Sequence, residues 1–485
     1  MGFYKLHIFC VALGFFLARG SLYAQPLLGD TGSTVERASL DRLAEVRSTM
    51  TPFQIGKIYI SGNKKTKPYI ILRELPFSEG DSVNLSQLVS GFEVARQQLM
   101  NTALFIDAVI SLRSFRGYSV DVQIDVKERW YILPLPYFKK VDRNLAQWQD
   151  EKFSFDRVKY GFKFNHNNFS GRNDKLRIWL ITGYSREIQI QYDQPYADPS
   201  LKHGFKVGFQ YSFTREVNYK TIGNKQVFSD TLGGISRYYA FADYLYRPGL
   251  RTFNSLRLAW VQESIAPQLL EPGNNPNFFS DNKTRISYPE LSYRLNYFKV
   301  DYIPYPLTGW MGELGFLKRG INKEMNMWEW SGKYTGSWNV YPKMYYFLQF
   351  LGQFRAPSHQ PFVNQRLLGY GDYNLSGLDR YVVDGIACGI LRQSVRRELL
   401  KVNVPSGFKS REHAIIPMRF YAKIFADLGY SRNPNNYQNS LGNSWLYSAG
   451  AGIDMVTIYD FVLRLDYAFN QLGENGLFLR IKSEF

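Results

Sequence analysis

The chain ends on Gly476-Leu477-Phe478-Leu479-Arg480-Ile481-Lys482-Ser483-Glu484-Phe485, a stretch whose pattern indicates the fold of the whole C-terminal part. Alternate residues of an extended strand share a face. One face here carries the apolar residues Leu477, Leu479, Ile481 and Phe485. The other carries the charged residues Arg480, Lys482 and Glu484. A strand with one apolar face, one charged face and a terminal aromatic residue is typical of a transmembrane β-barrel, where it separates lipid from a wet lumen.

The first residues are typical of an export signal. Residues 1–5 form a short segment made positively charged by Lys5, residues 6–18 are apolar, and Ala24 is a small residue at the expected cleavage point. The apolar run is shorter than a membrane-spanning helix needs. We therefore expect a signal peptide over residues 1–24, with an uncleaved anchor as the alternative. After residue 24 the single cysteine is Cys388, so no internal disulfide is expected.

Composition narrows the class of protein. The chain has 35 Tyr and 36 Phe, an abundance that suits barrel strands and their aromatic girdles. No other run approaches 18 apolar residues, so membrane-spanning helices are not expected. A soluble all-β protein is the alternative. The net charge of +17 is compatible with anionic lipid, whereas no nucleic-acid-binding motif accompanies it.

The region before the barrel divides into a tether, a small domain and a linker. Residues 25–51 are polar and are expected to be a periplasmic tether. Residues 52–130 predict an α/β domain of order β-α-α-β-β. Its first helix is expected to start at Thr66 and to end before Pro76, and its second to be capped by Asn84 or Ser86. Residues 131–152 are expected to be a linker.

Residues 153–485 are expected to form the barrel. Polar and apolar residues alternate in stretches such as 187–193, 206–213, 418–424 and 461–470. Such stretches have about the 9–11 residues that a tilted strand needs to cross a bilayer. The alternation predicts about sixteen antiparallel strands, with a first strand near residues 158–164 that pairs with the last one.

Two stretches in this region exceed a generic barrel pattern. One is the long stretch Pro357–Gly385, which shows no strand alternation, and long irregular loops are often functional. The other is Phe425–Gly429 on a strand, where Asp427 shares the lumenal face. A buried carboxylate needs a cation or hydrogen-bond donors, so we expect a partner for Asp427. The alternatives are an ordinary lumenal salt bridge and a merely flexible loop.

The small domain resembles a POTRA domain, the periplasmic module of the BamA/TamA superfamily of outer-membrane assembly and secretion proteins. The resemblance lies in residues 58–66, 70–75 and 79–81. The motif residues are Gly62, Asn63, Thr66, Arg73, Glu74 and Gly80.

The two barrel stretches resemble the same superfamily, in which one long loop folds into the lumen and its tip contacts an acidic residue on a strand. The strand motif here is Phe425, Asp427 and Gly429. The loop motif comprises Gly369, Gly371, Leu375, Ser376, Gly377, Arg380, Tyr381, Asp384 and Gly385. Ser376 stands where the superfamily has an arginine, and Leu378 where an aromatic residue is usual. We expect Arg380, or else Arg366, to provide the missing cation.

The resemblance implies an outer-membrane protein that inserts or translocates clients, with its POTRA domain in the periplasm. The implied partners are outer-membrane lipid, extended client proteins and accessory lipoproteins. A passive pore and a structural barrel without translocase activity are the alternatives. No catalytic motif is present, and the histidines lack metal-ligand spacing, so no enzyme activity, metal or cofactor is expected.

Overall fold

The computed structural model describes residues 52–140, 158–322, 324–405, 415–434, 439–457 and 460–482. The stretch Phe53–Phe485 forms one compact unit. The expected signal peptide, the tether and the terminal Phe485 lie outside the described residues.

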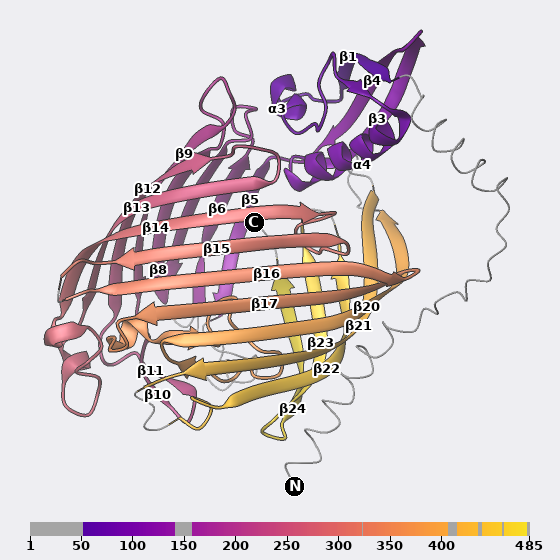
Figure 1. The fold of residues 1–485 in the computed structure, drawn as a ribbon. Helices are drawn as coiled ribbons and strands as arrows, with labels where there is room; N and C mark the ends of the chain where they lie inside the picture. Colours follow the sequence, from indigo (N-terminus) through magenta and orange to yellow (C-terminus); the bar gives the residue numbers. More distant parts are fainter. Residues whose placement is uncertain are drawn as a thin grey trace, which may run out of the picture. The chain divides into compact units, whose positions relative to one another are not determined.

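The first domain is a four-stranded sheet with two helices (Figure 1). Its elements are β1 (Phe53–Ser61), α3 (Pro68–Leu72), β2 (Ser82–Val83), α4 (Leu85–Asn101), β3 (Phe105–Arg116) and β4 (Ser119–Glu128). The sheet order is β2-β1-β4-β3, with β1 parallel to β4 and β3 antiparallel to it. The expected order of strand, two helices and two strands is confirmed, and the two-residue β2 is an addition.

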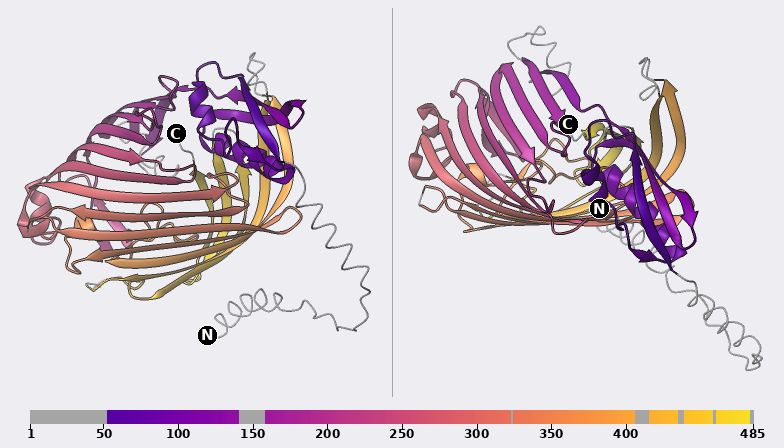
Figure 2. Two further views of the ribbon diagram at one scale, coloured as in Figure 1. Left: turned by 45° about the horizontal axis from the view of Figure 1, so that its top comes forward. Right: turned by 90° about the horizontal axis from the view of Figure 1, so that it is seen from above.

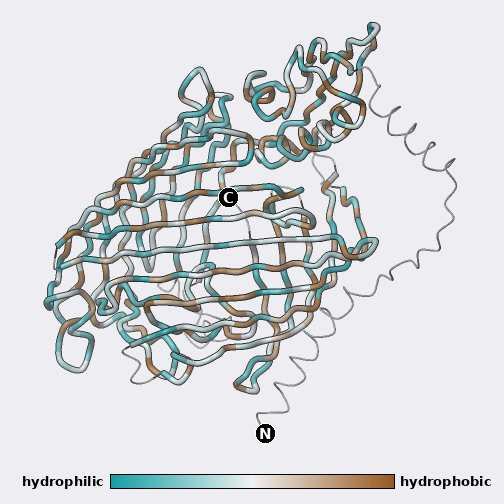
Figure 3. Tube along the Cα trace, in the orientation of Figure 1, coloured by the Kyte–Doolittle hydropathy of each residue, from teal (hydrophilic) through white to brown (hydrophobic). Residues whose placement is uncertain are grey.

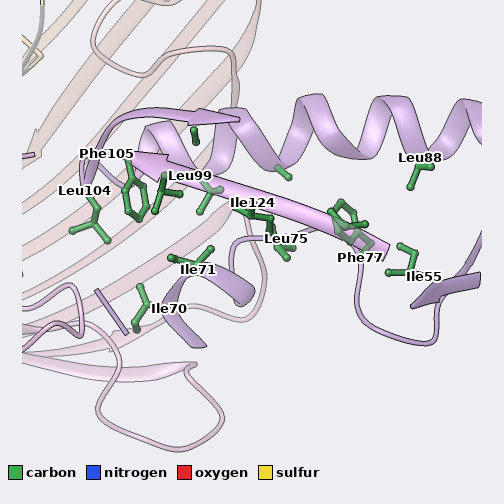
Figure 4. Packing of buried hydrophobic residues seen from close by; sticks show 14 of the residues in the cluster. Ile55, Ile70, Ile71, Leu75, Phe77, Leu88, Leu99, Leu104, Phe105 and Ile124 are labelled. Carbon is green, nitrogen blue, oxygen red and sulfur yellow. The ribbon is translucent and has the colours of Figure 1, made fainter. Parts of the chain in front are cut away.

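The helices pack their apolar residues on this sheet. Asn84 begins α4 with a capping box, since its side chain and that of Gln87 each accept the other's backbone N–H. Leu88 and Leu99 of α4 are buried together with Ile124 of β4 (Figure 4). The expectation for the other helix was wrong: α3 starts after Lys67, without a side-chain cap, and ends at Leu72. No described helix is long and apolar enough to cross a membrane.

The second part is one sixteen-stranded antiparallel sheet, in agreement with the predicted strand number. In sheet order its strands are β5 (Ile132–Lys140), β6 (Val158–Asn167), β7 (Lys175–Gly183), β8 (Ser185–Gln194), β9 (His203–Thr214), β12 (Ile235–Tyr246), β13 (Thr252–Ile265), β14 (Arg285–Val300), β15 (Gly309–Arg319), β16 (Met327–Tyr341), β17 (Met344–Ala356), β20 (Ala387–Pro405), β21 (Ile415–Arg432), β22 (Trp445–Val456), β23 (Val462–Asn470) and β24 (Asn475–Lys482). Figure 2 shows the sheet curving from the β5 side round to the β24 side.

Smaller elements lie in the loops. Two short hairpins are β10 (Val217–Ile222) with β11 (Lys225–Ser229), and β18 (Arg366–Leu368) with β19 (Val383–Asp384). The single-turn helices are η3 (Pro267–Leu270), η4 (Ser280–Asn282) and η5 (Phe362–Asn364).

The faces of the sheet follow the predicted alternation, which Figure 3 shows as changing hydropathy along each strand. Outward side chains such as Leu258, Ile424 and Leu477 are 61–66% exposed in the protein alone. Inward side chains include the buried carboxylates Asp427 and Asp454. Because apolar residues face outward and charged residues face inward, the outer surface suits lipid.

The start of the barrel differs from the prediction. The first strand is β5, which lies in the stretch expected to be a linker, and β6 is the second strand. The missed strand contains Pro134 and Pro136, which weaken a strand pattern in the sequence. An edge strand tolerates proline because one of its sides needs no hydrogen-bond donors. Among the described residues, β5 pairs with β6 and β24 with β23, so the expected pairing of first and last strands is absent.

Candidate functional site: the inward loop and the last strand

The stretch Pro357–Gly385 connects β17 to β20 and packs by its apolar side chains against the inner face of the sheet. Leu375 and Leu378 of the loop are 1% and 4% exposed. They belong to a cluster with Leu351, Ile390 and Leu446, which come from β17, β20 and β22. The loop is therefore held in the lumen by hydrophobic burial as well as by polar contacts.

The glycines of the loop and strand motifs let the loop approach the barrel strands closely. Gly377 has a φ of +80°, and a Cβ at this position would lie 3.1 Å from the Cβ of Ala468 on β23. A Cβ on Gly429 would lie 2.8 Å from Leu375 Cδ1. Gly369 has a φ of +89°, where any other residue would be strained. Gly371, at φ +57°, has open space around it and is the one of these glycines that only a turn requires.

Asp427 lies on β21, is 2% exposed and receives the loop tip. The backbone N–H of Ser376 donates to Asp427 Oδ2 at 3.0 Å. Arg392 of β20 stands directly opposite Asp427 in the strand pairing. Its guanidinium donates to the Asp372 carbonyl and to Asn374 Oδ1, each at 2.7 Å, so Arg392 fixes the loop just before its tip.

The cation at the loop tip is Arg480 of the last strand. Its Nη2 lies 2.7 Å from Asp379 Oδ2, and its Nη1 donates to Ser376 Oγ at 3.1 Å. The same guanidinium lies 3.4 Å from Asp466 Oδ2 on β23. The tip is therefore tied to β24 by charge, and to Asp427 of β21 by a backbone hydrogen bond.

The expected substitute arginines do not reach Asp427. Arg380 is exposed. Arg366 donates to the Asn218 carbonyl at 3.4 Å and lies over the Tyr370 ring. Within the described residues no lysine or arginine forms an ion pair with Asp427. The hypothesis that Arg380 or Arg366 replaces the missing arginine was wrong. Asp427 accepts from the Ser376 backbone N–H, and the cation at the loop tip, Arg480, pairs with Asp379 and Asp466 instead.

The remaining loop-motif residues join the tip to the β23–β24 hairpin and to the base of the loop. Tyr381 donates its hydroxyl to Glu474 at 2.8 Å, and Asn470 donates to the Gly377 carbonyl at 2.8 Å. Asp384 is buried in the β18–β19 hairpin, where the Tyr370 hydroxyl contacts it at 3.4 Å. A Cβ on Gly385 would lie 2.5 Å from the Arg432 carbonyl, so the loop base requires glycine.

An ion network continues from Arg480 along the lumenal wall. Lys423 Nζ lies 2.7 Å from Asp454 Oδ1 and 2.8 Å from Asp466 Oδ1. All three of these side chains are at least nine-tenths buried. Asp466 thus stands between two cations, Lys423 and Arg480.

Several POTRA motif residues contact turns between the barrel strands. Glu74 is 1% exposed and forms a two-oxygen ion pair with Arg247 of the β12–β13 turn, at 2.5 and 2.7 Å. Arg73 donates to the Leu201 carbonyl at 2.8 Å. The Tyr196 hydroxyl contacts Glu74 at 3.2 Å, and burial raises the pKa of this tyrosine.

The other POTRA motif residues shape the turn before α3. Thr66 is buried, and its hydroxyl accepts from Asn168 at 2.9 Å instead of capping the helix. Asn63 donates to the Thr66 carbonyl at 3.1 Å. Gly62 has a φ of +84°, and a Cβ there would lie 1.9 Å from the Val126 carbonyl. Gly80 has a φ of +92° in the turn before β2.

The sequence alone did not indicate four of the site residues, although alternation predicts that Arg480 faces the lumen. These four residues are Asp379, Arg392, Asp466 and Arg480. Among the described residues no group of three or more His, Cys, Asp or Glu side chains could hold a metal ion. The absence of a cofactor and of catalysis stays a prediction.

Comparison with known proteins supports the POTRA assignment. The family model for POTRA, "Surface antigen variable number repeat", matches residues 53–129. The outer membrane protein assembly factor BamA of Neorickettsia risticii (strain Illinois) is 29% identical over 143 residues. The match covers 28% of this chain and 17% of that relative, so the chain matches about a sixth of the relative's length.

Solved structures resemble the chain over more of its length. BamA from Haemophilus ducreyi lacking POTRA domains 1–3 has a TM-score of 0.50 at 14% identity, covering 89% of this chain and 84% of that one. CdiB from Acinetobacter baumannii has a TM-score of 0.46 at 15% identity, covering 89% and 73%. At this identity the likeness to BamA shows the fold alone.

Proposed function

We propose that this chain, a POTRA domain followed by a β-barrel of the BamA/TamA type, assembles or secretes client proteins at the bacterial outer membrane. One observation carries the proposal: among the described residues the barrel sheet ends on two edges, β5 and β24, that do not pair with each other. An unpaired edge exposes a row of backbone donors and acceptors that another strand can use. In a closed channel such edges have no role.

The POTRA domain offers a second edge. β3 is the outer strand of its sheet and pairs with β4 alone among the described residues. It exposes Val109, Leu112 and Phe115 by 50%, 39% and 56%. Extended peptides add to such an edge through main-chain hydrogen bonds, while apolar side chains increase affinity. We propose that β3 receives an extended client in the periplasm and that the barrel edges take it over.

Site-specific photocrosslinking tests this proposal. A benzoyl-phenylalanine at Leu479 of β24 is compared with one at Leu258 of β13, since these residues are 62% and 63% exposed. Client adducts at Leu479, without adducts at Leu258, are the expected result. Equal capture of lipid or protein at both positions would contradict transfer at the barrel edge.

The proposal places the protein in the outer membrane with its POTRA domain in the periplasm. Its partners are then outer-membrane lipid, extended clients and accessory lipoproteins. A passive pore is less well supported, because the apolar cluster of the inward loop fills space within the barrel. Conductance across a planar bilayer, with and without residues 357–385, separates the two: a pore conducts well with the loop present.

A further inference from the structure

The turn between β14 and β15 is long, stiff and folded into the barrel. It spans residues 301–308 and contains two prolines, Pro304 and Pro306. Asp301 Oδ1 accepts from the backbone N–H groups of Leu307 and Thr308 at 3.0 and 3.1 Å. These bonds close the turn at its base, and the prolines restrict its backbone, so it can transmit displacement as a unit.

Tyr305 at the tip of the turn is 2% exposed and reaches the lumenal wall of the C-terminal strands. Its hydroxyl donates to Asp454 Oδ2 of β22 at 2.9 Å. Its ring centroid is 5.0 Å from that of Tyr421 on β21, and the Arg396 guanidinium lies 4.6 Å from the Tyr305 ring. In the sheet order β16, β17 and β20 lie between β15 and β21, so the turn crosses part of the lumen.

Asp454 is the first member of the ion network that ends at the loop tip. Its Oδ1 holds Lys423, which also holds Asp466, and Asp466 lies beside Arg480. Arg480 binds Asp379 in the loop. Each buried charge in this network is balanced by its neighbours, so a change in one ion pair alters the strength of the adjacent ion pair.

The other side of the turn contacts the POTRA domain. Asn101, the last residue of α4, accepts from the Ile303 backbone N–H at 3.1 Å and donates to the Val300 carbonyl at 3.3 Å. The Tyr302 hydroxyl donates to Asp460 Oδ1 at 2.5 Å. Asp460 in turn is paired at 2.8 Å with Arg129, which follows the last POTRA strand.

We propose that the turn 301–308 couples the position of the POTRA domain to the closure of the inward loop, with Tyr305 as the positioning residue. Displacement of α4 pulls the turn through Asn101 and withdraws the Tyr305 hydroxyl from Asp454. Asp454 then draws Lys423 more strongly. The ion pair between Asp466 and Lys423 then weakens, so Asp466 competes with Asp379 for Arg480. The loop tip loosens as Arg480 interacts less with Asp379.

This coupling is a property of the fold, and only its use in client transfer rests on the proposed function. Hydrogen exchange of the loop-tip amides, residues 376–381, measures opening of the loop in the full-length chain in lipid nanodiscs. Asn101→Ala removes the two hydrogen bonds that Asn101 forms with Val300 and Ile303, while Tyr305→Phe removes one hydroxyl and keeps the ring. Gln97→Ala on the same helix and Tyr293→Phe, whose hydroxyl bonds Asn254 at 2.7 Å elsewhere on the sheet, are the matched controls.

We expect Asn101→Ala to accelerate exchange at the tip at least about fivefold, the lower end of typical coupling between sites. In the Tyr305→Phe background the same substitution should change exchange less than twofold, and both controls should leave it unchanged. An equal effect of Asn101→Ala in both backgrounds, or none in the native background, would overturn the coupling.

Asp454→Asn provides a second turn-side variant if Tyr305→Phe does not fold, as judged by heat-modifiable gel mobility. It should abolish the response to Asn101→Ala in the same way, and a full response would overturn the proposal. The measurement needs no client. If the exchange experiment shows no coupling but client adducts form at Leu479, the proposed function still stands. If coupling is found but no client adducts form at Leu479, the coupling still stands.

Discussion

At the scale of single residues, Arg480 is the point where the loop, the last strand and the lumenal wall meet. Its side chain is 23% exposed, that of Asp379 is 27% exposed and that of Asp466 is 2% exposed. Water therefore screens the pair with Asp379 in part, whereas Asp466 depends on its cations for compensation. Ser376, which is small, lets its backbone N–H reach Asp427 while its hydroxyl accepts from Arg480.

Replacing Arg480 by methionine should loosen the loop, because Asp379 loses its cation and Asp466 keeps Lys423 alone among the described cations. Loss of hydrogen bonds to charged groups costs about 1.5–3 kcal/mol each, reduced here by partial exposure. Limited proteolysis should show new cleavage between residues 357 and 385. Arg380→Ala is the matched control and should behave as the native chain. Equal protease sensitivity of the two variants would show that Arg480 does not hold the tip.

A pH effect is expected in the POTRA domain at Asp121. A hydrogen bond from the Lys57 backbone N–H, followed by those from Arg116 and Ser114, holds the pKa of this carboxyl below its ordinary value. Because the folded-state pKa is depressed, the contribution to stability is present above the unfolded value of about 3.9 and is lost as pH falls through the folded value.

Urea unfolding of the POTRA domain within the intact chain, followed by hydrogen exchange of β1 and β4, measures this contribution. The native chain should lose more stability between pH 6 and pH 3 than Asp121→Asn does. An identical pH dependence of the two proteins would mean that Asp121 does not titrate with unfolding.

The side on which a lumenal residue lies could be predicted from sequence, but its partner could not. Period-two alternation places Asp427 and Arg480 inside, as found. Ser376 and Arg480, however, are 104 residues apart, and their contact depends on how deeply the loop enters the barrel. Arg380 lies near Gly377 in the sequence, yet its side chain is exposed in the structure.

At the scale of elements, the barrel turns beside the POTRA domain are defined by contacts that no local sequence pattern predicts. Arg247 in the β12–β13 turn has no helix or strand signal, but it neutralises Glu74 of the POTRA domain. The capping box of α4 was predictable because it is local, whereas β5 was missed because its prolines resemble a linker. Local signals therefore predict the start of α4 and the regular strands. They fail at β5 and at the start of α3, where the Thr66 hydroxyl accepts from the distant Asn168 instead of capping the helix.

Breaking the Glu74–Arg247 pair should release the POTRA domain from this turn. Glu74→Gln leaves Arg247 buried without its counter-ion, and removal of one partner of a buried pair costs about 3–5 kcal/mol. Spin labels at Ser90 and Ser200, in a Cys388→Ser background, should give a broader distance distribution in this variant. Glu93→Gln on the outer face of α4 is the control.

The double variant Glu74→Leu/Arg247→Met should restore a narrow distribution, since replacing both charges by apolar groups removes the uncompensated charge. If Glu74→Gln leaves the distribution as narrow as the control does, the pair does not set the position of the domain.

At the scale of the whole molecule, one POTRA domain and one sixteen-stranded sheet account for the described chain. Strand number and order of the parts could be predicted, because lipid and a wet lumen impose period two on every strand. The separation of the two end strands could not be predicted. β5 and β24 do not pair with each other among the described residues, and nothing in either strand's sequence indicates this. In the proposed function these edges, and the loop tied to β24, handle client proteins.

Depletion of the protein followed by quantitative proteomics of the outer membrane is the sharpest test of client handling. A subset of β-barrel or secreted proteins should fall in abundance and should recover with the native chain. Arg480→Met should restore these proteins less well than Arg380→Ala, because the inward loop is tied to β24 through Arg480. An unchanged outer-membrane proteome, accompanied only by altered permeability to small solutes, would exclude client handling and indicate a passive pore.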